Sequence, residues 1–244
     1  MSTRLSCRSL CIEGVAFGEV TLSSANGVNP LSLSAVRALR EQLAALAGPQ
    51  APHGLVIRAE GRFFCAGADV KEFRDFDADR FRGYMTEVLG LYADLIDAPR
   101  PILSLVQADA LGAGAALALC SDFVLAADPV RFAFPEAQRG LAGGGYLMPR
   151  LIGRQRAAEM VLLGRPLSAQ RAEQLGLVNE VCAPEAFAAR TRAWLAEIAA
   201  IAPGAFAVGK RSLAGGLSVD LRQAMDWHVQ AQTEAFIQAR DAQA

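Results

Sequence analysis

Apolar residues at the start of the chain recur at nearly every second position, which is typical of β-strands. Residues 9–13 and 18–22 follow this alternation, and Gly14 and Gly18 interrupt it, so the pattern predicts a hairpin. After Ser32 the spacing changes to that of a helix with one apolar face, carried by Leu33, Val36, Leu39, Leu43 and Leu46. The chain is therefore expected to begin with strands and to continue into an amphipathic helix.

Short apolar strands then alternate with helices along the middle of the chain. The pattern predicts strands at 55–57, 102–106 and 123–126, with helices near 84–97 and 112–120 between them. Buried strands that are separated by helices are typical of parallel sheets covered by helices. We therefore expect an α/β fold.

From about residue 155 the pattern is almost wholly helical, with helices predicted near 168–175, 184–201 and 218–240. Residues 204–211 nearly match a phosphate-binding loop, but Arg211 replaces the Ser or Thr that would bind magnesium and no strand precedes the segment. The segment is interpreted as a turn before a helix. We expect the helices after residue 200 to pack on the body of the protein or on another subunit.

The composition is that of a globular protein with a sizeable core, since 52% of the 244 residues are hydrophobic and 20% are charged. The formal net charge is −1, and no long run carries one sign, so we expect neither a nucleic-acid partner nor binding to an anionic membrane. The longest apolar stretch, residues 110–120, is too short to span a bilayer.

The cysteines predict a reducing compartment. They are odd in number and form no Cys-x-x-Cys pair, and the N-terminus lacks a long apolar signal segment. We therefore expect a cytoplasmic protein with free thiols. No grouping of His, Cys, Asp and Glu has the spacing of metal ligands, so no metal site is predicted.

Two segments place small residues where a predicted strand gives way to a turn or helix. Residues 64–73 follow the strand that ends near residue 59, and residues 108–122 follow the strand at 102–106. Small residues let a ligand approach the main chain, and free amides at a helix start attract negative charge. Taken alone, each segment is more often explained by packing.

The two segments in this order, followed by Phe-x-x-Pro-Glu, resemble the crotonase (enoyl-CoA hydratase/isomerase) family. The matching residues are Ala66-Gly67-Ala68-Asp69, Gly112-Ala113-Gly114 and Phe132-Ala133-Phe134-Pro135-Glu136, with further matches at Ser121-Asp122 and 172–178. The resemblance covers about residues 9–215, and the combination of motifs, rather than any one of them, is specific for the family.

The resemblance implies an α/β fold built as a spiral of ββα turns, with a helical C-terminal region used to form trimers. We therefore predict a crotonase core that carries the acyl-CoA site in residues 1–199, and a helical region in residues 200–244. The family also implies a homotrimer or a dimer of trimers.

The resemblance assigns catalysis to two main-chain amides and one carboxylate. The proton alpha to a thioester is too weakly acidic to remove unless donors hold the developing enolate oxygen. This role falls to the amides of Ala68 and Ala113, although Ala113 stands where the family usually has glycine. Glu136 takes the role of acid and base, for which partial burial would raise its pKa. Without the family match, Glu136 would be interpreted as a solvated loop residue.

The resemblance also implies that the substrate is bound largely through backbone groups, at Ala66, Ala68, Asp69, Val70, Lys71, Gly112 and Ala113. Lys71 could meet a CoA phosphate, although residues 71–82 could equally form a solvated helix face. The expected partner is an acyl-CoA thioester, and CoA enters as part of this substrate, so no separate cofactor is expected.

The sequence departs from the family at two informative places. Ala116 stands where hydratases of the family carry a second glutamate, and Tyr146 enters a stretch, 140–150, that small residues usually line. One carboxylate can still take a proton from carbon 2 and return it at carbon 4. Ala116 therefore favours a Δ3,Δ2-enoyl-CoA isomerase, and Tyr146 alters the pocket for the acyl chain.

The sequence is also compatible with three other functions. The first is a hydratase or dehydratase that uses Glu136 alone and positions water with other groups. The second is a thioester decarboxylase, which needs the same oxyanion hole. The third is a non-catalytic CoA-binding subunit that has kept the fold.

Overall fold

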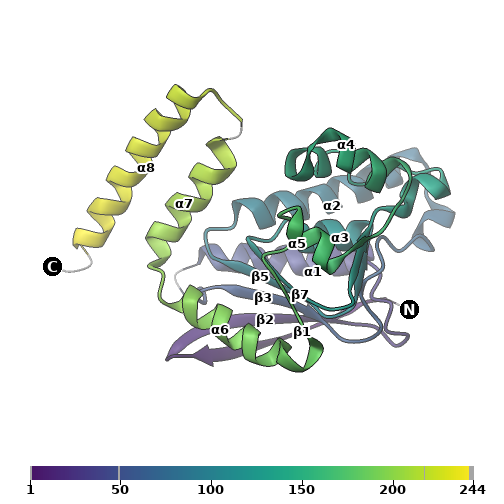
Figure 1. Cartoon of the computed structure of the whole chain (residues 1–244), viewed down its shortest axis with the longest axis horizontal. Helices are drawn as coiled ribbons and strands as arrows, with labels where there is room; N and C mark the ends of the chain where they lie inside the picture. The colour runs from purple at the N-terminus through teal and green to yellow at the C-terminus, as the bar shows by residue number, and fades with distance from the viewer. Residues whose placement is uncertain (1, 49, 217, 242–244) are drawn as a thin grey trace.

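A six-stranded sheet forms the floor of the molecule in the computed structural model, which describes residues 2–48, 50–216 and 218–241 (Figure 1). The predicted core (1–199) and the predicted helical region (200–244) both include residues outside the described ranges, namely 1, 49, 217 and 242–244. The strand order is β1-β2-β3-β5-β7-β10, with bounds β1 Arg4–Ile12, β2 Val15–Ser23, β3 Leu55–Ala59, β5 Ile102–Val106, β7 Phe123–Ala127 and β10 Glu180–Cys182. Strands β1 and β2 form an antiparallel hairpin, and the remaining pairs are parallel. The predicted hairpin and parallel sheet are therefore confirmed.

A second, smaller sheet lies beside the first and has the order β4-β6-β8-β9. Its strands are β4 Phe63–Cys65, β6 Asp109–Leu111, β8 Arg131–Ala133 and β9 Leu167–Ser168. Strands β4, β6 and β8 run parallel, whereas β9 is antiparallel to β8. Because each strand has only two or three residues, it is too short to show a hydrophobic period by which the sequence could predict it.

The helices begin where the sequence supplies caps. Helix α1 starts after Ser32, whose hydroxyl accepts a hydrogen bond from the Ala35 amide, and α2 starts after Asp77, whose carboxylate accepts one from the Arg80 amide. The α-helices are α1 Leu33–Ala44, α2 Ala78–Asp97, α3 Ala113–Leu119, α4 Met148–Leu162, α5 Ala169–Gln174, α6 Phe187–Ala199, α7 Pro203–Gly216 and α8 Leu221–Asp241. Short 3-10 helices are η1 Ala45–Ala47, η2 Glu72–Asp75, η3 Pro135–Arg139 and η4 Pro184–Ala186.

The core lies between the larger sheet and the layer of helices α1, α2 and α3 (Figure 1). Strand β5 is buried along its whole length, as expected of a central parallel strand that is covered on both faces. Leu39 and Leu43 of α1 and Leu91 and Leu95 of α2 are at most 3% exposed. The apolar spacing in the sequence therefore identified the face of α1 that enters the core.

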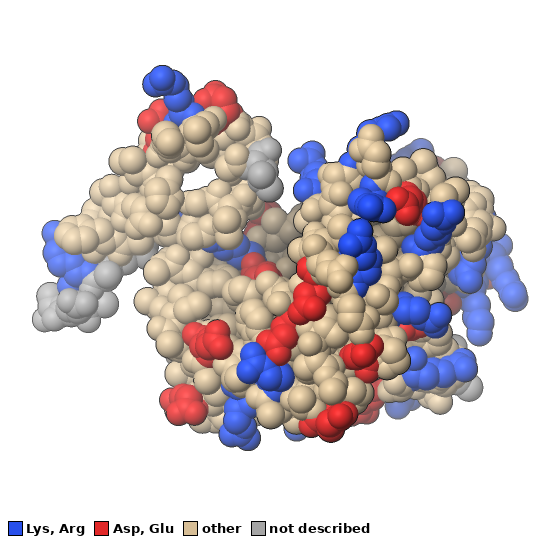
Figure 2. Space-filling view, in the orientation of Figure 1, with Lys and Arg blue, Asp and Glu red and all other residues tan. Residues whose placement is uncertain are grey.

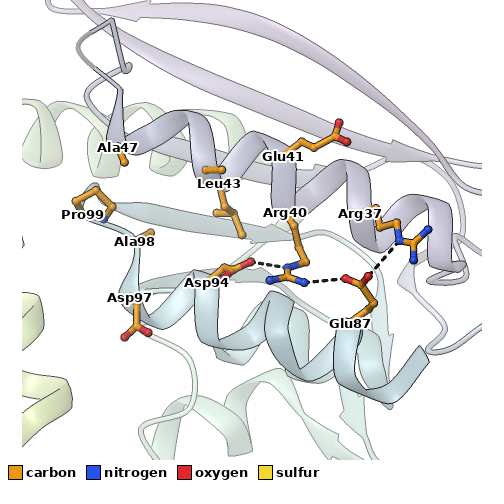
Figure 3. Close-up of a pocket in the computed structure, with 11 residues that line it drawn as sticks. Arg37, Arg40, Glu41, Leu43, Ala47, Glu87, Asp94, Asp97, Ala98 and Pro99 are labelled. Carbon is orange, nitrogen blue, oxygen red and sulfur yellow. Dashed lines mark hydrogen bonds and ion pairs between the residues drawn. The ribbon is translucent and has the colours of Figure 1, made fainter. Parts of the chain in front are cut away.

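Ion pairs fix the position of α2 along α1 on the outer side of this layer. Arg40 contacts Glu87 at 2.7 Å and Asp94 at 2.6 Å, and Arg37 contacts Glu87 at 3.2 Å, across a groove between the two helices (Figure 3). Exposed pairs of this kind contribute only about 0–1 kcal/mol each. Their main consequence is positional, because the opposite side of α2 forms a wall of the candidate site.

The C-terminal helices α7 and α8 form a hairpin that projects from the body (Figure 1). Lys210 anchors α7, because its ammonium group donates to the Leu95 carbonyl at 2.8 Å and to the Asp122 carboxylate at 2.9 Å. Residues 204–211 thus lie inside α7, and the prediction of a turn there is wrong. The glycines of this segment are tolerated in α7 because tertiary contacts override local propensity.

On the face shown in Figure 2, charges of both signs are interspersed, with Lys and Arg more frequent around α4. Within the described ranges, no single helix has the length and apolar character needed to cross a membrane. One pair, Pro184–Ala199 with Pro203–Gly216, meets the criterion only when it is taken together, and it is bent by 99°.

Candidate active site

The candidate site lies at the ends of three neighbouring parallel strands. Strand β4 leads to Ala68, β6 leads to Ala113, and β8 leads to Glu136. Because the carboxyl ends of parallel strands meet at one edge of a sheet, these residues come together although 68 residues separate the first from the last. The short strands that the sequence pattern did not predict are therefore the elements that build the site.

The amides of Ala68 and Ala113 have no hydrogen-bond acceptor within the described ranges of the chain. Ala113 is the first residue of α3, where no intrahelical carbonyl is available to its N–H group. Ala68 follows Gly67, which has a φ of +101° and turns the chain at the end of β4. Among the described residues, neither amide donates a hydrogen bond to another group. Two free donors at such turns attract negative charge.

Close packing holds the two turns together. A Cβ built on Gly67 would lie 3.1 Å from the Leu111 carbonyl oxygen and 3.6 Å from the Ala113 nitrogen. A Cβ built on Gly114 would lie 2.7 Å from the Cys65 sulfur, closer than real Cβ atoms approach. Gly67 and Gly114 therefore allow β4 and α3 to meet, which keeps the turns that carry the two amides next to each other.

Glu136 enters the same site from η3 and is partly buried. Burial raises the pKa of the Glu136 carboxyl above its ordinary value, although the main-chain N–H of Glu136 and the positive charge of Arg139 oppose the shift. The Oε2 atom of this carboxylate is buried and has no hydrogen-bond partner in the part of the chain that the structure describes. A buried acceptor without a partner is uncommon and needs a ligand or a functional reason.

Two glycines provide the space for this carboxylate. A Cβ built on Gly143 would lie 2.6 Å from Oε1 and 2.7 Å from Oε2 of Glu136, and a Cβ on Gly112 would also collide with Oε1. Gly112 has a φ of +53°, which favours glycine on conformational grounds as well, whereas Gly143 does not have a left-handed backbone. Gly143 is therefore required by the side chain of Glu136 rather than by its own conformation.

Ala68, Gly112, Ala113 and Glu136 line one cavity of about 300 Å³. Its wall is formed by α2, the start of α3 and the segment from 134 to 146, and it is mainly apolar and aromatic. A concave apolar cavity with a few converging polar groups is the usual form of a small-molecule site. The arrangement suits a ligand with an apolar part and one oxygen that accepts from the two amides.

The remaining predicted binding residues lie beside this cavity rather than in its lining. Ala66 is partly buried, Val70 is 45% exposed, and Lys71 is exposed. The Asp69 carboxylate accepts a hydrogen bond from the Lys71 amide at 3.2 Å. Ala66 directly follows β4, and the other three residues lead from the Ala68 turn to η2; the contact of all four with CoA stays a prediction.

Helix α2 contributes a wall of the cavity that was not predicted from the sequence. Phe81, Tyr84, Val88 and Tyr92 line the cavity at spacings of three to four residues, which is one face of a helix. This periodicity was available in the sequence, but it equally describes a face that packs in a core. Ala116, where the resemblance implies a second glutamate in hydratases, also lines the cavity and is 1% exposed.

No metal centre is found in the described part of the chain. Groups of three or more His, Cys, Asp and Glu that could hold an ion do not occur among these residues.

Comparison with known proteins gives a consistent result. Residues 13–243 match the model of the family described as enoyl-CoA hydratase/isomerase. A probable enoyl-CoA hydratase of Rhizobium meliloti is 33% identical over 171 residues, which are 69% of this chain and 66% of that protein, slightly less than two thirds. The mitochondrial enoyl-CoA hydratase domain-containing protein 2 of Homo sapiens is 32% identical over 231 residues, which are 91% of this chain and 79% of that protein.

A solved structure agrees over nearly the full length. The enoyl-CoA hydratase from Bacillus anthracis superposes with a TM-score of 0.88 at 27% sequence identity, covering 96% of this chain and 91% of that one. The α/β spiral with a helical C-terminal region, predicted from the sequence, is therefore confirmed.

Proposed function

Because the chain belongs to the enoyl-CoA hydratase/isomerase (crotonase) family, we propose that it shifts the double bond of a Δ3-enoyl-CoA to the Δ2 position. The observation that carries this proposal is the orphaned, buried Oε2 of Glu136, which lies in an apolar cavity with two unpaired amides. A carboxylate without a partner is available to take a proton, and the amides are available to stabilise the anion that results.

In this mechanism the thioester oxygen accepts hydrogen bonds from the Ala68 and Ala113 amides. As Glu136 removes a proton from carbon 2, the electrons of the C–H bond move onto the thioester oxygen and form a dienolate. The two donors stabilise this charge where it develops, and one such donor is typically worth about 2.7–4 kcal/mol of barrier. Glu136 then returns the proton to carbon 4, and the electrons re-form the thioester carbonyl and the Δ2 double bond.

The raised pKa of Glu136 supports its role as the base. A carboxylate with a pKa nearer the working pH takes up a proton from carbon more readily than an ordinary one does. Ala116 supports isomerisation as the lead activity, because its methyl group offers no second acid or base. A proton shuttle between two carbons of the same chain requires only one such group.

The proposal includes the way the substrate is held. Ala66, Asp69, Val70 and Lys71 would follow the CoA moiety along the turn after β4, with exposed Lys71 near a phosphate. No cofactor beyond the CoA of the substrate is required, because amides and one carboxylate suffice to move a proton.

The assembly and location of the protein are also proposals. We expect the protein to form a homotrimer, or a dimer of trimers, through contacts made by residues 200–244. We expect it to be located in the cytoplasm. Helix α8 supports an assembly because it exposes large apolar side chains, including Met225, Trp227 and Phe236. The division at residue 199 follows the end of α6, after which the chain leaves the body.

A hydratase or dehydratase is the second candidate. It is supported by the family description and by the similar proteins, whose names include hydratase. A thioester decarboxylase and a non-catalytic CoA-binding subunit remain further alternatives, the latter because Ala116 has replaced one expected carboxylate.

The test is to incubate the purified protein with a 3-enoyl-CoA and to follow the absorbance of the conjugated 2-enoyl thioester. We expect conjugation by the wild type and a loss of about 10²–10⁴-fold in Glu136→Gln, the usual contribution of a general base. Glu41→Gln, on the outer side of α1, is the matched control and should retain activity. Full activity in Glu136→Gln would exclude this mechanism, and CoA binding without turnover of any acyl-CoA would favour the non-catalytic subunit.

A further inference from the structure

The chain has three tyrosines, and all of them line the candidate cavity. Two have committed hydroxyl groups: Tyr84 donates to the Leu31 carbonyl at 2.7 Å, and Tyr92 donates to the Ala113 carbonyl at 2.8 Å. Tyr146 differs, because its hydroxyl has no hydrogen-bond partner among the residues that the structure describes. It is therefore the tyrosine in the cavity whose hydroxyl is available to a ligand.

The ring of Tyr146 is held in place by Tyr92. The two ring centroids are 6.2 Å apart, and the planes differ by 15°. This spacing lies in the range of interacting aromatic pairs. Since Tyr92 is in turn fixed to the Ala113 carbonyl, the ring of Tyr146 is oriented relative to one of the two free amides.

Tyr146 lines the same cavity as Glu136, and the two groups interact electrostatically. Although the residue is 46% exposed, burial raises the pKa of its hydroxyl, and the negative charges that Cys120 and Glu136 carry when ionised raise it further. The phenol therefore stays neutral, within electrostatic reach of the Glu136 carboxylate. A neutral hydroxyl has one donor and two acceptor sites, so it can hold a water molecule or a substrate hydroxyl.

The polar groups of the cavity lining are few. Apart from the committed hydroxyls of Tyr84 and Tyr92, the polar side chains in the described lining are Glu136 and Tyr146. The sequence places Ala116 where a second carboxylate would complete a hydratase, and its side chain faces this cavity. One free hydroxyl is thus present in the cavity from which one carboxylate is missing.

We propose that Tyr146 is the second catalytic group of the site, and that its hydroxyl holds the oxygen that adds to, or leaves, carbon 3 of the acyl group. The protein then catalyses hydration of a 2-enoyl-CoA as well as the double-bond shift. This inference rests on the proposed function, because it uses the same amides and the same Glu136 carboxylate.

The step balances with these two groups. One O–H of the water passes its proton to Glu136 while the oxygen bonds to carbon 3 and the π electrons move onto the thioester oxygen. The other O–H donates a hydrogen bond to the Tyr146 hydroxyl oxygen, which keeps the water over carbon 3. Glu136 then returns its proton to carbon 2, and the thioester carbonyl re-forms. Dehydration is the reverse sequence.

The test compares two reactions in one protein. Isomerisation of a 3-enoyl-CoA and hydration of crotonyl-CoA are measured for the wild type, Tyr146→Phe, Thr86→Val and Glu136→Gln. We expect Tyr146→Phe to lower the ratio of hydration to isomerisation at least about tenfold, the usual scale for one lost catalytic hydrogen bond. Thr86→Val is the matched control, because it removes an exposed hydroxyl that donates to the Arg82 carbonyl outside the cavity lining, and it should leave that ratio within about twofold of the wild type.

The outcomes separate this inference from the proposed function. If the wild type isomerises but does not hydrate, or if Tyr146→Phe lowers both rates equally, the role of Tyr146 is refuted and the isomerase remains. If the wild type does neither, the proposed function and this inference fall together. Loss of both reactions in Glu136→Gln, with selective loss of hydration in Tyr146→Phe, supports both.

Discussion

Replacing Gly143 by alanine tests whether the position of the Glu136 carboxylate, and not only its presence, determines activity. The added methyl group would lie 2.6 Å from Oε1 and 2.7 Å from Oε2, whereas ordinary contacts begin at 3.4 Å. The carboxyl carbon of Glu136 would be nearer still, at 2.4 Å, so the carboxylate must move by roughly 1.0 Å, a displacement that typically costs about 10² in rate. We expect kcat/KM for isomerisation to fall about 100-fold, which corresponds to about 2.7 kcal/mol.

The fold should survive this change. Gly143 does not have a left-handed φ, so alanine introduces no backbone strain, and the group that must yield is the end of a flexible side chain. We expect circular dichroism and the midpoint of thermal unfolding to be close to those of the wild type. Gly112→Ala is a poorer test, because its φ of +53° would add strain to the same collision.

Gly145→Ala is the matched control. It lies two residues along the same loop, has no left-handed φ, and a Cβ built there has no atom within 4 Å. We expect it to keep the wild-type rate with 3-enoyl-CoA. If Gly143→Ala and Gly145→Ala are equally active, the carboxylate does not need the position described here, and the argument from its packing is refuted.

Three further predictions concern the base, the anchor of α7 and the junction of the two turns. Because burial raises the pKa of Glu136 and only the ionised carboxylate is a base, activity should fall with decreasing pH at a midpoint above the ordinary 4.5, as a pH profile of kcat/KM would reveal. Lys210→Met leaves the Asp122 carboxylate without its counter-charge and should lower the free energy of unfolding by about 3 kcal/mol in urea titrations. This loss should shrink at acid pH, since a protonated Asp122 needs no partner. Gly114→Ala should separate α3 from Cys65, so we expect reduced thermal stability together with loss of turnover; full turnover would contradict the packing argument.

The sequence predicted those parts of the fold that have a period long enough to recognise. Strand β5 at Ile102–Val106 and helix α1 after Ser32 agree with the predicted bounds, because a continuous apolar run and a capped amphipathic face are strong local signals. Strands β4, β6 and β8 were not predicted, since two or three residues pair only where the rest of the fold brings them together.

The candidate site was predicted by resemblance rather than by pattern. Ala68, Ala113 and Glu136 were named from motifs, and the structure brings them to one cavity, while their chemical roles stay predictions. The space that Gly143 leaves for Glu136 could not be predicted, because it depends on contacts between separate loops. Tyr146 was recognised as a departure from the family, but its free hydroxyl became evident only beside Tyr84 and Tyr92.

The ends of β4, β6 and β8 supply two different kinds of group to the site, main-chain amides and side chains. This separation affects how the activity of such a protein can change during evolution. The proposed anion-binding half consists of main-chain atoms at the ends of β4 and β6, so a scan that replaces side chains one by one would largely fail to detect it. The groups that we propose determine the reaction, Glu136 and Tyr146, lie in the segment after β8, from η3 to the start of α4. Evolution, or a protein engineer, can therefore exchange that segment for new acids, bases or walls while the binding half is inherited unchanged.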